Sequence, residues 1–138
     1  MFSAKRLDHV TFSVTDLEEA ARTWQRTLGL DLDMLFEPHG SHLRLGRLPL
    51  GDAFVELVQP LGGTAAPGEG MLSISMEVDD LVAAVADLRR RGVIVSDPQD
   101  GSWPGTQVAR ISPESAHGVP IELVGRMAEP ERAENPQE

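Results

Sequence analysis

The chain has 138 residues, a net charge of −10 with histidine neutral, 41% hydrophobic residues and no cysteine. This length predicts one domain with a single core, and the composition excludes a disordered chain. The absence of cysteine excludes disulfides, thiolate catalysis and cysteine–zinc sites. The acidic charge disfavours binding to nucleic acids. No apolar run is long enough for a membrane span or a signal peptide, so we expect a cytoplasmic protein.

The first 60 residues predict one strand, one helix and three further strands. Residues 7–14 alternate polar and apolar side chains, which is typical of a strand with one wet face. Thr15 or Asp16 suits the N-cap of the helix that follows, and Gly29 suits its C-terminal end. Three strands are then expected, at residues 30–36, 42–48 and 53–58.

The same order of elements recurs after a linker at residues 61–70, which is rich in glycine and proline. A strand is expected at 72–78, and Asp79 and Asp80 precede a helix that ends at the arginines before Gly92. Strands are expected at 93–95, 107–112 and 119–124, with a loop at 96–105. The polar residues 127–138 are expected to form a disordered tail.

The two halves correspond residue by residue. At an offset of 64, Val14, Asp16 and Leu17 meet Val78, Asp80 and Leu81, and at an offset of 66 Glu56 meets Glu122. The sequence therefore predicts an α+β fold of two tandem βαβββ modules, at residues 1–60 and 71–126, in one compact domain. Neither module buries its sheet alone, so we expect the two sheets to enclose a trough.

Two carboxylates lie in the middle of apolar strands, at equivalent places in the two modules. Glu56 and Glu122 have apolar neighbours on both sides, and burial of an unpaired carboxylate is costly. Either each faces solvent, or both point into the trough and bind a divalent cation together with His9. One imidazole and two carboxylates suit Zn, Co, Ni, Mn or Fe.

Several short motifs, in order and at matching spacing, resemble the vicinal oxygen chelate superfamily, which includes glyoxalase I, extradiol dioxygenases, bleomycin-resistance proteins and methylmalonyl-CoA epimerase. The resemblance covers about residues 6–125 and is nearest to the epimerase branch. The motifs are Leu-Asp-His-Val (7–10), Asp-Leu-Glu-Glu-Ala (16–20), Leu-Gly-Leu (28–30), Val-Glu-Leu (55–57), Gly-Glu-Gly (68–70), Glu-Val-Asp-Asp (77–80), Arg-Gly-Val (91–93) and the segment from Ser-Pro to Ile-Glu-Leu-Val (112–124).

The resemblance implies an open, barrel-like cup and a divalent metal held by His9, Glu56 and Glu122. The fourth ligand position of the family falls on Ser73, where the epimerases have a histidine. Serine is a poor ligand, so either the metal has three protein ligands, with Ser73 binding a water, or it is absent from this chain.

The resemblance further implies an enzyme, either an epimerase or isomerase or a glyoxalase-like lyase, that moves a proton α to a thioester carbonyl. Glu122 or Glu56 would act as the base. The substrate, an acyl-CoA in the epimerases, would also contact Thr11 and Ser73. Arg44 and His42 share one face of the strand 42–48 and are expected to bind substrate there.

The alternative is a metal-free cup that binds a small molecule without catalysis, as bleomycin-resistance proteins do. The resemblance also implies a homodimer. Trp103 lies in a loop rich in glycine and proline, where it either closes the cup or anchors the loop.

Overall fold

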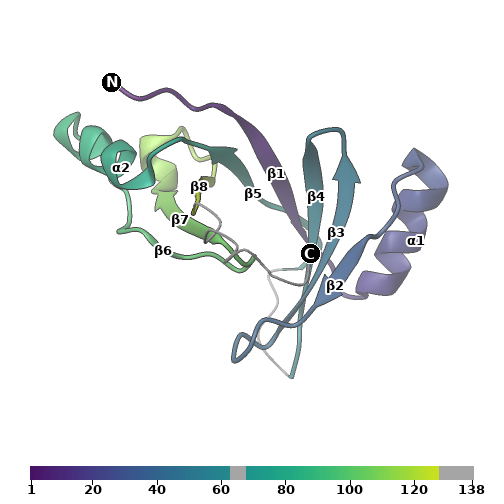
Figure 1. Cartoon of the computed structure of the whole chain (residues 1–138). Helices are drawn as coiled ribbons and strands as arrows, with labels where there is room; N and C mark the ends of the chain where they lie inside the picture. Colours follow the sequence, from purple (N-terminus) through teal and green to yellow (C-terminus); the bar gives the residue numbers. More distant parts are fainter. Residues whose placement is uncertain (63–67, 128–138) are drawn as a thin grey trace, which may run out of the picture.

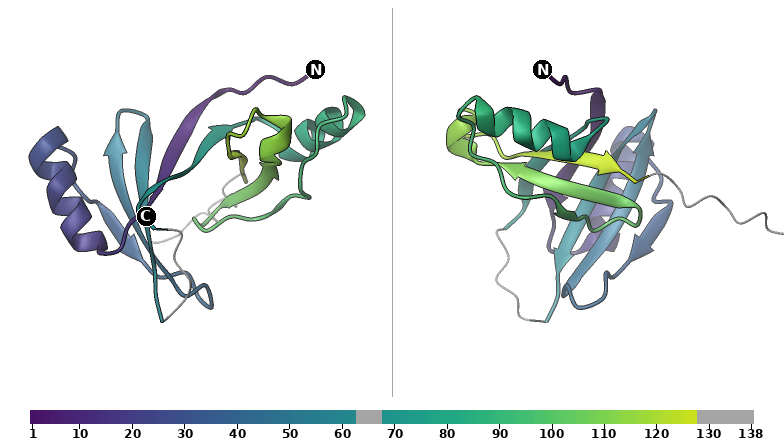
Figure 2. Two further views of the ribbon diagram at one scale, coloured as in Figure 1. Left: turned by 180° about the vertical axis from the view of Figure 1, so that it is seen from behind. Right: turned by 60° about the vertical axis from the view of Figure 1, so that its left-hand side comes forward.

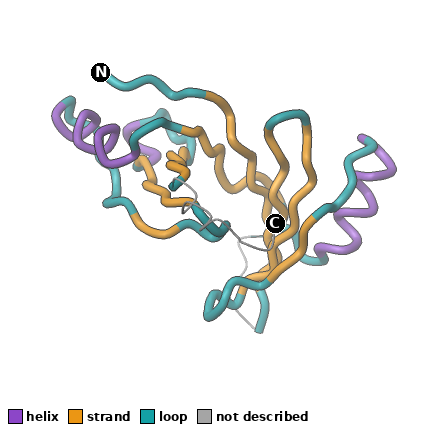
Figure 3. Tube along the Cα trace, viewed as in Figure 1, coloured by secondary structure: helices purple, strands orange, loops and turns teal. Residues whose placement is uncertain are grey.

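The computed structural model describes residues 1–62 and 68–127. One curled sheet and two helices make up this part of the chain (Figures 1 and 3). The elements are β1 (Arg6–Ser13), α1 (Leu17–Leu28), β2 (Met34–Phe36), β3 (Leu43–Leu50), β4 (Ala53–Pro60), β5 (Gly70–Glu77), α2 (Leu81–Arg90), β6 (Gln99–Asp100), β7 (Thr106–Ile111), a short 3-10 turn (Pro113–Ser115) and β8 (Ile121–Arg126).

The sheet is arranged symmetrically about its centre, in the order β2-β3-β4-β1-β5-β8-β7-β6. β1 and β5 pair antiparallel at the centre, and each pairs in parallel with the last strand of its own module, β4 or β8. The helices α1 and α2 lie at opposite outer sides of the curled sheet (Figures 1 and 2). This arrangement confirms the predicted pair of βαβββ modules and leaves the inner face of the sheet open.

The helices begin and end at the predicted residues. The Asp16 side chain accepts a hydrogen bond from the backbone N–H of Glu19, and Asp80 accepts one from Ala83. Gly29 adopts a left-handed conformation, with φ of 71°, at the C-terminal end of α1. These caps satisfy backbone groups that a helix end leaves without intrahelical partners.

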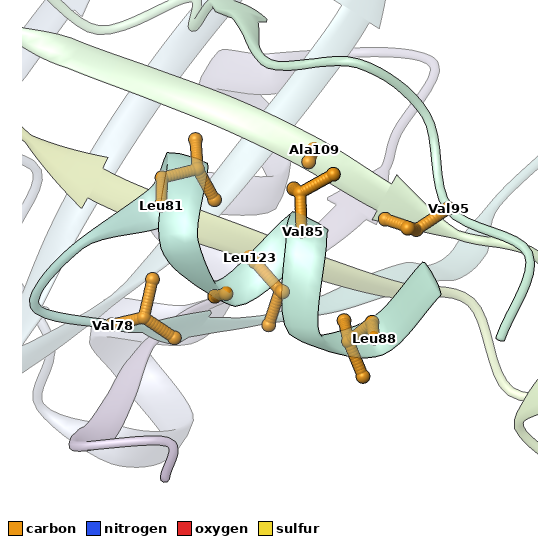
Figure 4. Packing of buried hydrophobic residues seen from close by; sticks show 8 residues of the cluster. Val78, Leu81, Val85, Leu88, Val95, Ala109 and Leu123 are labelled. Carbon is orange, nitrogen blue, oxygen red and sulfur yellow. The ribbon is translucent and has the colours of Figure 1, made fainter. Parts of the chain in front are cut away.

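Each helix packs on its own module and forms a separate core. α1 places Leu17 and Ala21 against Leu48, Val55 and Leu57 of the first module. α2 packs on the second module through an equivalent set, shown in Figure 4, which consists of Val78, Leu81, Ala84, Val85, Leu88, Val95, Ala109 and Leu123. The helices thereby cover one face of the sheet and leave the other face available for a site.

The third strand of the second module differs from the prediction. Residues 93–95 were expected to form a strand, but the structure has only an isolated bridge between Val95 and Ile111 there. The two-residue strand β6 lies instead within residues 96–105, which were expected to form a loop. Pro98 lies between the bridge and β6, and because proline has no N–H it interrupts the ladder.

Part of the expected linker and nearly all of the expected tail, residues 63–67 and 128–138, lie outside the described residues. Neither helix, within residues 1–62 and 68–127, has the length and apolar character that a bilayer span requires.

Two glycines in the sheet allow the first residues of the helices to approach it closely. The two positions differ in how easily the side-chain atoms that contact the glycine can move. A Cβ on Gly125 would lie 2.9 Å from the Cβ of Leu81, the first residue of α2. A Cβ on Gly46 would meet the terminal methyl groups of Leu32 and Leu17, at 2.9 and 3.0 Å. Methyl groups at the end of a side chain move more readily than a Cβ.

We therefore expect Gly125→Ala to lower the free energy of unfolding by about 1–3 kcal/mol. Gly46→Ala, the matched control, should lower it by less. Urea denaturation of both variants measures the difference. An equal or larger loss at Gly46 would show that α2 adjusts more easily than the position of Leu81 suggests.

Candidate functional site

A cavity of about 700 Å³ opens on the inner face of the sheet, between the two modules. Apolar side chains from both modules form much of its wall, including Leu45, Val58, Val108 and Ile121. Polar side chains gather in it as well, and those with hydroxyl, carboxyl, imidazole or guanidinium groups are His9, Thr11, Glu56, Ser73, Ser96, Asp100, Ser102, Arg110, Ser112 and Glu122. An apolar cavity with convergent polar groups is typical of a small-molecule site.

His9 lies at the centre of these polar groups and is fixed on three sides. Its side chain is 5% exposed, and its ring stacks on Phe54 with the centroids 4.5 Å apart. Nδ1 lies 2.8 Å from the Asp8 carboxylate. Nε2 faces two carboxylate oxygens, Oε1 of Glu56 and Oε1 of Glu122, at 3.8 Å from each. The two carboxylates at equivalent places in the repeat thus converge on one imidazole.

Asp8 determines which ring nitrogen of His9 donates a hydrogen bond and which faces the two glutamates. Burial raises the pKa of Asp8, but the hydrogen bonds from His9 and Arg126 and their charges outweigh burial and lower the pKa below its usual value. An ionised Asp8 only accepts hydrogen bonds, so Nδ1 of His9 is the donor and Nε2 is directed at the two carboxylates. Arg6 also donates to Asp8, at 3.0 Å.

The two carboxylates have equivalent hydrogen bonds in the two modules. The hydroxyl of Thr11 donates to Glu56 Oε1 at 2.7 Å, and the hydroxyl of Ser75 donates to Glu122 Oε1 at 2.8 Å. In each case the hydroxyl and the carboxylate lie opposite each other on paired strands, Thr11 with Glu56 and Ser75 with Glu122. The internal repeat therefore builds the same carboxylate support twice.

Glu56 also accepts a hydrogen bond from the indole N–H of Trp103, which comes from the second module. Burial raises the pKa of Glu56, while the His9 charge and the hydrogen bonds from Thr11 and Trp103 lower it and the Glu122 charge raises it. Burial prevails, so the pKa of Glu56 is above its usual value. A carboxyl group with a raised pKa is suited to accept and return a proton.

The structure brings most of the predicted site residues together. His9, Thr11, Glu56, Ser73 and Glu122 all line the cavity. Ser73 lies opposite Thr11 across the β1–β5 pair, and His9 lies opposite Ser75. Ser73 is therefore the counterpart of His9 under the approximate symmetry of the two modules.

Arg44 and His42 were expected to bind substrate from the strand 42–48, but neither residue lines this cavity. Arg44 forms an ion pair with Glu18 of α1 at 2.7 Å, which places it on the helix-covered side of β3. His42 precedes β3, is exposed and has a φ of 56°. Leu43 and Leu45 line the cavity from β3 instead.

The sequence analysis did not identify three residues that contribute to the site: Asp8, Ser75 and Arg110. Asp8 precedes His9 directly, so its adjacency was a usable signal. Ser75 and Arg110 each lie opposite Glu122 on a paired strand, which requires the register of the sheet. Trp103 was considered as a lid, but its hydrogen bond to Glu56 depends on a loop from the other module.

The donor set suits a divalent metal. An imidazole nitrogen oriented by a carboxylate, together with two carboxylate oxygens, is a common set of metal ligands. The 3.8 Å separations are wider than the roughly 3.0–3.4 Å between neighbouring ligands on a bound zinc ion. In the part of the chain that the structure describes, no group of three or more His, Asp or Glu side chains has the arrangement of a preformed metal centre. Binding would require both carboxylates to move inward.

Comparison with known proteins identifies the family of this chain and some of its relatives. Residues 8–109 match the family model for the Glyoxalase/Bleomycin resistance protein/Dioxygenase superfamily. An ethylmalonyl-CoA/methylmalonyl-CoA epimerase of Cereibacter sphaeroides is 30% identical over 129 residues, which cover 86% of this chain and 96% of that protein.

Solved structures of epimerases are similar to this chain over 91% of its length. A methylmalonyl-CoA epimerase from Mycobacterium tuberculosis has a TM-score of 0.80 and 27% identity, over 91% of its own chain. A methylmalonyl-CoA epimerase from Streptomyces coelicolor, in complex with 2-nitronate-propionyl-CoA, has a TM-score of 0.79 and 28% identity, over 97% of its own chain. With its family match, its fold and these relatives, the chain belongs to the glyoxalase/bleomycin resistance protein/dioxygenase superfamily.

Proposed function

We propose that this protein is an epimerase of the methylmalonyl-CoA epimerase type, which removes and returns a proton α to a thioester carbonyl. The observation that carries the proposal is the convergence of Glu56 and Glu122 on His9 Nε2 inside the cavity. The 30% identity to an epimerase and the structural similarity to epimerases, one of them with an acyl-CoA analogue bound, support it.

We further propose that His9, Glu56 and Glu122 hold a divalent ion such as Co, Zn, Ni, Mn or Fe. When bound, such an ion stabilises the negative charge that develops on the thioester oxygen as the proton leaves. Asp8 fixes the direction of His9 Nε2, as carboxylates behind metal-binding histidines commonly do.

The chain's own residues divide the proton transfer between them. Glu56, when it is not bound to the ion, accepts the proton from the carbon next to the thioester carbonyl, and burial raises its pKa in the site without an ion. Return of this proton from Glu56 restores the starting configuration, whereas a protonated Glu122 that donates its own proton to the opposite face inverts the carbon. Thr11 and Ser75 hold the two carboxylates in place through their hydroxyls.

The second candidate is a metal-free cup that binds a small molecule without catalysis. The observation that favours it is Ser73, which takes the place equivalent to His9 and supplies no imidazole. The homodimer and the cytoplasmic location that the sequence analysis expects stay predictions.

Hydrogen exchange distinguishes the two candidates. In D₂O with added Co²⁺, the protein should incorporate deuterium at C2 of methylmalonyl-CoA, and Glu56→Gln should slow this by about 10²–10⁴-fold. Glu19→Gln, on the exposed face of α1, is the matched control and should exchange normally. Binding of methylmalonyl-CoA without exchange, at any metal content, would favour the second candidate.

The metal-binding proposal has a separate test in Ser73→His. A histidine at the position equivalent to His9 adds a second imidazole to the donor set. We expect Co²⁺ to bind at least about tenfold more tightly, which corresponds to about 1.4 kcal/mol. Titration calorimetry measures the dissociation constant. Unchanged affinity would indicate that a side chain at position 73 does not reach the metal.

Trp103 offers a test of Glu56 as the base. Its indole N–H lowers the pKa of Glu56, so Trp103→Phe should raise that pKa further. A base must be deprotonated to act, so the rising acid limb of the exchange rate should move to higher pH. Trp24→Phe is the control, because Trp24 belongs to α1, packs against Phe12 and does not line the cavity. If the acid limb of the exchange rate does not move in Trp103→Phe, a group other than Glu56 is the base.

A further inference from the structure

Arg110 is the one side chain with a permanent positive charge among the described residues that line the cavity. The other ionisable groups there are the carboxylates of Glu56, Glu122 and Asp100 and the imidazole of His9. The cavity would therefore repel an anion, except where Arg110 attracts it. Arg110 has no part in the proton transfer proposed above.

The Arg110 guanidinium lies next to the reacting groups. Arg110 of β7 and Glu122 of β8 are opposite each other in the sheet, and Nη2 of Arg110 lies 3.6 Å from Oε2 of Glu122. The Arg110 side chain is nevertheless 61% exposed. A group bound at Arg110 would thus sit beside Glu122 and remain reachable from the cavity.

The donors of Arg110 are available, in contrast to those of the arginines nearby. Arg6 and Arg126 donate to Asp8, and Arg47 holds Asp33 through two hydrogen bonds of 3.0 Å. Across residues 1–62 and 68–127, the Arg110 guanidinium makes no hydrogen bond, and its ion pair with Glu122 is long. A planar guanidinium with unused donors matches the two oxygens of a carboxylate.

We propose that Arg110 is the specificity-determining residue, which binds a carboxylate attached to the reacting carbon of the acyl group. The proposal rests on the proposed epimerase function. In an acyl thioester of the malonyl type, the carbon that loses its proton also carries the carboxylate. The group that binds this carboxylate must therefore lie within a few ångströms of the acid–base residues, as Arg110 does.

The test compares malonyl-CoA with propionyl-CoA, which carries a methyl group where malonyl-CoA carries this carboxylate and is otherwise identical. Titration calorimetry gives the dissociation constant of each. We expect the protein to prefer malonyl-CoA, and Arg110→Gln to reduce that preference by about 10- to 100-fold without weakening propionyl-CoA. Arg110→Lys keeps the charge and should retain part of the preference.

Arg44→Gln is the matched control, since it removes one arginine from the helix-covered side of β3 and changes the net charge equally. It should leave the preference intact. If Arg110→Gln does not fold, the Arg110→Lys variant provides the test, because it lacks the planar guanidinium. An undiminished preference of this variant for malonyl-CoA would overturn the proposal. Equal weakening of both ligands would also overturn it, because Arg110 would then bind the shared CoA part.

The exchange experiment on the same samples separates this inference from the proposed function. Normal exchange with a preference that ignores Arg110 overturns the inference and leaves the epimerase function standing. A preference controlled by Arg110 without any exchange supports the inference and contradicts the epimerase function. Binding of neither thioester contradicts both.

Discussion

The antiparallel pairing of β1 with β5 is the constraint on which the site depends. It joins the two modules edge to edge and sets His9 opposite Ser75 and Thr11 opposite Ser73. Because β4 and β8 pair in parallel with these strands, the same register brings Glu56 and Glu122 to the centre of one face. A shift by one residue would turn all of these side chains to the helix-covered side. The register of one strand pair thus assembles a site from both halves of the chain.

The buried His9 requires support that extends through the molecule. Its side chain is enclosed by the Asp8 carboxylate and the Phe54 ring. Asp8 is itself fully buried and is stabilised by Arg6 from β1 and Arg126 from the end of β8. Removal of either arginine would leave a buried negative charge with less compensation. The orientation of His9 therefore relies on contacts that link the first strand of the chain to the last.

Much of the fold follows from local signals in the sequence. The aspartate caps, Gly29 and the offset of 64 residues identify both helices and the repeat, and the two mid-strand glutamates identify the centre of the site. These signals work because capping and alternation depend on neighbouring residues. The tandem arrangement then follows from the need of each sheet to bury one face.

The assignment of Arg44 shows where such reasoning ends. Alternation along β3 correctly separates Leu43 and Leu45 from Arg44 and Gly46, but it does not say which set faces the helix. That choice is made by α1, whose Leu17 packs on Gly46 and whose Glu18 pairs with Arg44. The role of Trp103 likewise depends on a distant contact, since its hydrogen bond to Glu56 joins residues 47 positions apart. Contacts between distant elements determine these residues, and no local pattern encodes them.

The repeat is symmetric in its backbone and asymmetric in its chemistry. Thr11 and Ser75 give the two carboxylates equivalent hydrogen bonds, yet the place in the second module that is equivalent to His9 holds a serine, Ser73. Trp103 contacts Glu56, whereas Glu122 has Arg110 beside it. One carboxylate is therefore enclosed and raised in pKa, and the other lies beside a cation that is open to the cavity. Two equivalent glutamates thereby become two chemically different groups.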